Sequence, residues 1–102
     1  MAEPVEAWAT MPIPDLMNAV QRATGLLCAQ IEVHAADEGA YQRAFWTHWQ
    51  KCPEDWSIAA SNRECERACA ALHEARLLTG ALVESMRAKR DSMVAVLAAR
   101  AK

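Results

Sequence analysis

The sequence predicts an all-α protein, and three observations support that prediction. Alanine, the strongest helix former, accounts for 22 of the 102 residues. The chain holds only three glycines and four prolines, too few turn residues for a β-sandwich or a barrel. Apolar residues recur three and four positions apart along most of the chain, which is the spacing of an amphipathic helix. We therefore expect a single helical domain over residues 15–102.

The first fourteen residues are expected to form an extended, proline-rich arm. Pro4, Pro12 and Pro14 all lie there, and proline disfavours a regular helix. Trp8 lies in this arm and needs a surface to rest on, either on this domain or on a neighbouring chain.

Three helices are expected beyond the arm. The first is capped by Asp15 and runs to about Asp37, where Asp-Glu-Gly at 37–39 supplies a turn. A shorter second helix, over about 40–51, would then complete a helical hairpin. The break at 52–56 leads into one long C-terminal helix, with a capping-box restart near Ser61.

One stretch of the long helix is expected to be largely buried. Residues 77–83 are apolar nearly all round, which is typical of a buried helix and, in so short a chain, indicates partners. Leu72, Leu82 and Met86 are predicted to be interior, and Gly80 is a candidate kink.

Charge is distributed unevenly along the chain. Residues 1–38 carry about −5, residues 39–70 are balanced, and residues 71–102 carry about +3, which gives the net charge of −2. The low pI of about 5.9 disfavours nucleic-acid binding, and no apolar run is long enough for a transmembrane helix. The C-terminal bases are either a solvated helix end or a contact for an acidic partner or membrane surface; they are Arg87, Lys89, Arg90, Arg100 and Lys102.

No catalytic motif is present in the sequence. There is no nucleophile elbow, no HExxH, no phosphate-binding glycine loop and no dinucleotide fingerprint. We therefore expect neither enzymatic activity nor a cofactor.

The four cysteines leave three alternatives open. They could pack as small apolar side chains, form a disulfide, or bind zinc. Cys65 and Cys69 lie one helical turn apart, too far for a bridge to each other, but each could pair with Cys28 or Cys52. With a turn near residue 39, Cys28 and Cys52 can also face each other. The zinc alternative uses two i,i+4 pairs, with His73 as a spare ligand: His48, Cys52, Cys65 and Cys69.

Two short segments carry a resemblance to a known family. Tyr-Gln-Arg at 41–43, followed by Cys-Pro-Glu-Asp-Trp at 52–56, is similar to the coiled-coil-helix (CHCH) proteins of mitochondria, which include subunit VIb of cytochrome c oxidase. The resemblance implies a small helical subunit on the intermembrane-space side of a respiratory complex, folded by oxidation. The family's further cysteines would fall at Gln42 and at Asn18 or Glu38, so at most a Cys28–Cys52 bridge is implied.

The sequence thus predicts a non-catalytic accessory subunit of a larger complex, mitochondrial if the resemblance holds and otherwise cytoplasmic. Its partners would be other protein subunits, including those of a membrane complex that it contacts peripherally. The alternative is a free-standing helical adaptor or inhibitor, of the phage-encoded or secretion-chaperone type. Candidate interface residues are the tryptophans that one small core cannot enclose: Trp8, Trp46 and Trp56.

Overall fold

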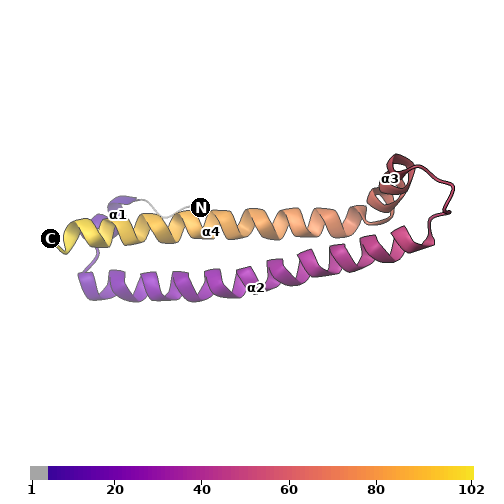
Figure 1. Cartoon of the computed structure of the whole chain (residues 1–102). Coiled ribbons are helices and arrows are strands. Elements are labelled where there is room, and N and C mark those ends of the chain that lie inside the picture. Colours follow the sequence, from indigo (N-terminus) through magenta and orange to yellow (C-terminus); the bar gives the residue numbers. More distant parts are fainter. Residues whose placement is uncertain (1–4) are drawn as a thin grey trace. The chain divides into compact units, whose positions relative to one another are not determined.

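The computed structural model describes residues 5–102, and over these residues the chain is helical without a strand, which confirms the all-α prediction (Figure 1). Its helices are α1 (Val5–Thr10), α2 (Ile13–Lys51), α3 (Ile58–Ala68) and α4 (Ala70–Arg100). These helices form two compact units. The first unit combines the chain up to Gln30 with Leu82–Lys102, and the second unit is Ile31–Ala81.

The expected extended arm is largely helical instead. Val5–Thr10 forms α1, and α2 begins at Ile13 rather than at Asp15. The Pro12 carbonyl accepts the first hydrogen bond of α2, from the amide of Leu16 at 3.0 Å. Proline is tolerated here because the first amides of a helix have no intrahelical partner. Pro4 lies outside the described residues.

The turn predicted at residues 37–39 is wrong, and so is the hairpin built on it. α2 continues through Gly39 to Lys51 as one helix. A glycine costs a helix only about 1 kcal/mol. Glu38 also pairs with Arg76 of α4, a contact that requires this segment to remain helical alongside α4.

The predicted long third helix is divided into α3 and α4. Ser57, rather than Ser61, caps α3: its Oγ accepts a hydrogen bond from the amide of Ala60 at 3.1 Å. Ser61 is buried inside α3, and Cys69 leaves the helical conformation between the two helices. α4 runs through Gly80 without a break.

The first unit has an apolar core to which α1, α2 and α4 all contribute. Leu16 is fully buried and packs with Trp8 and Met93. The Arg100 guanidinium donates a hydrogen bond to the carbonyl of Trp8 at 2.6 Å, which ties the end of α4 to α1. Trp8 therefore rests on its own chain, and its proposed role at an interface is not supported.

Candidate functional site

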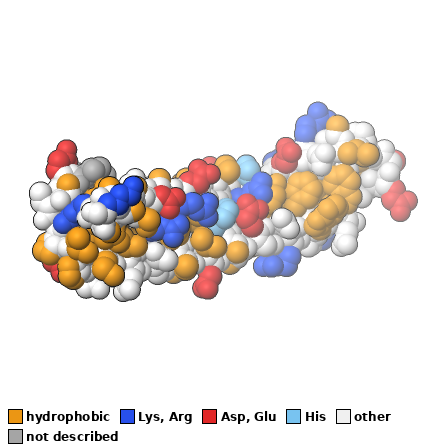
Figure 2. All heavy atoms as spheres, turned by 60° about the vertical axis from the view of Figure 1, so that its left-hand side comes forward, with side chains coloured by type: hydrophobic (Ala, Val, Ile, Leu, Met, Phe, Trp, Pro, Cys, Tyr) orange, Lys and Arg blue, Asp and Glu red, His pale blue; other side chains and the backbone are white. Residues whose placement is uncertain are grey.

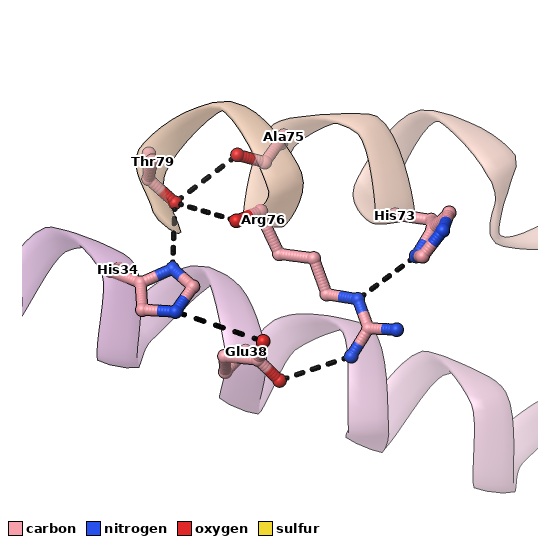
Figure 3. Close-up of polar contacts among 6 residues, drawn as sticks. All are labelled: His34, Glu38, His73, Ala75, Arg76 and Thr79. Carbon is pink, nitrogen blue, oxygen red and sulfur yellow. Dashed lines mark hydrogen bonds and ion pairs between the residues drawn. The ribbon is translucent and has the colours of Figure 1, made fainter. Parts of the chain in front are cut away.

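In the second unit α2 and α4 meet through a partly buried polar network (Figure 3). His34 Nδ1 lies 3.0 Å from the hydroxyl of Thr79, and its Nε2 lies 3.8 Å from a carboxylate oxygen of Glu38. The other oxygen of Glu38 accepts a hydrogen bond from Arg76 at 3.1 Å. Because contacts nearer the end of α2 involve earlier residues of α4, these two segments run antiparallel.

Arg76 is the centre of this network. Besides Glu38 it contacts His73, whose Nδ1 accepts a hydrogen bond from Arg76 Nε at 2.9 Å. The guanidinium carbon also lies 3.9 Å from the centre of the Tyr41 ring, within cation–π range. His73 Nδ1 thus serves as a hydrogen-bond acceptor for Arg76. The network holds two helices in register and includes no activated nucleophile.

Aromatic rings line the C-terminal half of α2. Neighbouring rings in this row have their centres 5.9 to 6.3 Å apart; the residues are Tyr41, Phe45, Trp46 and Trp49. Trp46 differs from the other three because 60% of its surface is exposed. The sequence anticipated this, since Trp46 lies off the apolar stripe of its helix.

Trp56 is the second exposed indole of this unit, with 44% of its surface accessible. It lies in the connection between α2 and α3 and lines two shallow cavities. One cavity is shared with Arg63 and Arg67 of α3, and the other with Cys52.

The stretch at 77–83, which was expected to be buried and to indicate partners, is mostly exposed within this chain. Leu78 is 68% exposed, Leu77 is similar, and Leu82, predicted to be interior, is 51% exposed. Only Val83 is buried, whereas Leu72 and Met86 are half-buried.

Exposed apolar side chains occur in both units, and Figure 2 shows such side chains reaching the surface among charged ones. In the second unit the large exposed apolar residues are Ile31, Val33, Trp46, Trp56, Ile58, Leu77 and Leu78. In the first unit they are Ile13, Met17, Leu26, Leu82 and Val94.

All four cysteines are free thiols, so no disulfide is present. Cys28 lies on α2 and Cys52 directly follows its last residue, so the turn that would have brought the two cysteines face to face is absent. The thiol of Cys52 instead donates a hydrogen bond to the carbonyl of His48 at 3.4 Å. Burial, with a smaller contribution from Cys52, raises the pKa of Cys65.

The zinc candidates are not assembled into a site. Among the described residues, no group of three or more histidine, cysteine or acidic side chains could hold a metal ion. Cys65 and Cys69 are buried, but the spare ligand His73 is committed to Arg76 and Tyr41.

Charged side chains on α3 form an exposed surface pair. Glu64 accepts hydrogen bonds from the guanidinium of Arg67, one of them at 3.1 Å from Nε. This contact lowers the pKa of Glu64 and raises that of Arg67. Because both side chains are exposed, they form a solvated helix face, and exposed pairs of this kind contribute little to stability.

The described helices include none that is both long and apolar enough to span a bilayer. Comparison with protein-family models, with curated proteins and with solved structures finds no match to this chain.

Proposed function

We propose that this chain is a non-catalytic helical subunit that acts by binding other proteins. The observation that carries the proposal is the amount of apolar surface left uncovered. Large apolar side chains stay exposed in both units, among them Trp46 with 60% and Leu78 with 68% of their surface accessible.

The second unit supplies the strongest candidate contacts. Trp46 and Trp56 are both exposed, and tryptophan is enriched among the residues that dominate binding energy. Leu77 and Leu78 add exposed apolar area on α4. A protein surface with its own apolar patch is the partner that suits these side chains best.

Membership of a respiratory complex is the narrower form of this proposal. It is supported by the CHCH resemblance at residues 41–43 and 52–56. The latter segment forms a helix connection, in which the amide of Trp56 donates to the Pro53 carbonyl at 3.1 Å. In this form the chain would reside on the intermembrane-space side of mitochondria, and fractionation of the native cells tests that location.

A free-standing cytoplasmic adaptor or inhibitor is the second candidate. The four free thiols favour it, because reduced cysteines are typical of reducing compartments. Counting thiols in the native protein, with and without a reductant, distinguishes this candidate from a subunit folded by oxidation.

The binding proposal is tested by comparing Trp46→Ala with Gln21→Ala, an exposed polar residue of α2 in the first unit. Each tagged chain is expressed in its native cells, and its apparent size is measured by gel filtration of the extract. We expect the wild type and Gln21→Ala in a larger assembly, and Trp46→Ala mostly released although still helical by circular dichroism. A wild-type chain that elutes as a free monomer would contradict the proposal.

A further inference from the structure

We propose that an aromatic cavity lined by α2 and α3 binds the guanidinium group of an arginine side chain on the partner protein. The cavity lies within the second unit and has a volume of about 240 Å³. Three rings, an amide and a carboxylate line it, from Tyr41, Phe45, Trp46, Gln42 and Glu66. The inference names one contact of the proposed binding function and therefore rests on that function.

Two of these rings stand at nearly a right angle to each other. The planes of Phe45 and Trp46 are inclined at 85°, and their ring centres lie 6.2 Å apart. Phe45 is half-buried, whereas Trp46 is exposed and open to an incoming group. The face of an aromatic ring attracts a cation, and the indole of tryptophan does so most strongly.

Glu66 supplies a negative charge to this cavity. It is exposed on α3, and no hydrogen bond or ion pair engages it within residues 5–102. The nearby acid Glu64 differs, because it is already paired with Arg67. Of the described residues that line the cavity, none is basic. The cavity thus combines aromatic rings and a carboxylate that lacks a partner of opposite charge.

The arginines of this chain that are nearest in sequence to the cavity have other positions. The guanidinium of Arg43 lies beside Gly39, where an added Cβ would be 3.0 Å from one of its nitrogens. Arg63 lines the separate cavity that contains Trp56. A cation that binds between the rings and Glu66 is therefore expected to come from another molecule.

The same aromatic row already binds one guanidinium in this way. Arg76 lies 3.9 Å from the centre of the Tyr41 ring and pairs with the carboxylate of Glu38 at 3.1 Å (Figure 3). An aromatic ring and a carboxylate together thus hold an arginine within this unit. Because Arg76 covers one face of Tyr41, the rings available to a second cation are those of Phe45 and Trp46.

The size of the cavity favours a single head group. Pockets for drug-sized ligands usually have volumes of about 300–1,000 Å³, so this smaller cavity suits the end of a side chain. Arginine fits better than lysine, because its planar guanidinium stacks on rings and donates two parallel hydrogen bonds to a carboxylate. The exposed surface of Trp46 beside the cavity would contact the rest of the partner.

The first test measures recognition of the cation by the isolated full chain. N-acetyl-arginine amide is titrated into isotope-labelled protein, and the indole N–H signals are followed by NMR, with Trp46→Phe identifying the signal of Trp46. The control is N-acetyl-citrulline amide, in which an uncharged urea group of nearly the same shape replaces the guanidinium. We expect a saturable shift of the Trp46 signal with the arginine compound, and binding of the citrulline compound weaker by about two- to fivefold. Equal binding of both compounds, or no shift with the arginine compound, would overturn the inference.

The second test measures the contact in the native assembly. Glu66→Gln removes the charge with little change of shape, and Glu74→Gln, at an exposed acid of α4, is the matched control. By gel filtration of native extracts, we expect Glu66→Gln to raise the ratio of free to assembled chain by about two- to fivefold. Glu66→Lys, which adds a like charge, should raise this ratio further. The control should behave as the wild type does.

The outcomes of the second test separate the two proposals. A wild-type chain that elutes as a free monomer contradicts the proposed binding function itself. If the wild type is assembled and both Glu66 variants remain assembled as Glu74→Gln does, the binding function stands and the arginine contact is overturned.

Discussion

The helices inside each of the two units are joined by a different kind of contact. In the first, Leu16 is fully buried against Trp8 and Met93, so apolar packing joins its helices. In the second, α2 and α4 meet through Glu38 and Arg76 among rings and hydroxyls. A polar contact specifies register but removes little apolar area from water. The second unit accordingly retains more large apolar side chains at its surface than the first.

The largest effect is expected from emptying the core of the first unit. Leu16→Ala should lower the free energy of unfolding by about 2–5 kcal/mol, because a fully buried leucine leaves a cavity. Urea denaturation measures the change. The neighbouring Met17→Ala is the matched control, since Met17 is half exposed and its loss should cost much less. Equal losses for both variants would show that the described core does not govern stability.

A smaller effect is expected from removing the centre of the polar network. Arg76→Ala loses the ion pair with Glu38, the hydrogen bond to His73 and the cation–π contact with Tyr41, for about 1–3 kcal/mol together. Arg76→Lys keeps the charge but not the planar fork, so it should recover only part of the loss. Full recovery with lysine would mean that charge alone matters at this position.

The smallest effects are expected from two glycines, one in each unit. Gly25→Ala should stabilise the chain by about 0.5–1 kcal/mol, since alanine favours helix and an added Cβ meets nothing within 4 Å. At Gly80 the same Cβ would lie 3.1 Å from Cε1 of His34, so Gly80→Ala should gain less or destabilise.

A double-mutant cycle sharpens this comparison. Combining Gly80→Ala with His34→Ala removes the crowding, and the alanine at position 80 should then give the gain seen at position 25. Thermal unfolding followed by circular dichroism measures all the variants. Identical shifts for Gly25→Ala and Gly80→Ala would exclude the close approach of His34.

Local signals in the sequence predict much of the fold, and the predictions that were wrong have identifiable physical causes. Apolar residues three and four positions apart predicted an amphipathic helix where α2 forms, and Leu16 and Leu27 are buried on it. The turn at 37–39 was predicted from residue types that often end helices, but Glu38 finds its partner in Arg76, 38 positions later. Such a contact has no local signature.

Some features of the candidate site could likewise be predicted from the sequence, and others could not. The exposure of Trp46 was predictable, because its angle around the helix differs from that of Phe45. The cavity that Cys52 shares with Ser61 depends on how α3 packs beside the end of α2, which sequence spacing does not specify. Leu82 was misplaced because an apolar residue at helical spacing indicates burial without saying which chain provides it.

The central claim is that buried residues of the first unit stabilise the chain, whereas exposed indoles of the second unit bind its partner. The most direct test measures both the melting temperature of the isolated chain and its share in the native assembly, for Leu16→Ala and Trp46→Ala. The account predicts a large fall in melting temperature for Leu16→Ala. It predicts a shift of at most a few degrees for Trp46→Ala, with release from the assembly. A Trp46→Ala chain that melts as early as Leu16→Ala while remaining assembled would contradict it.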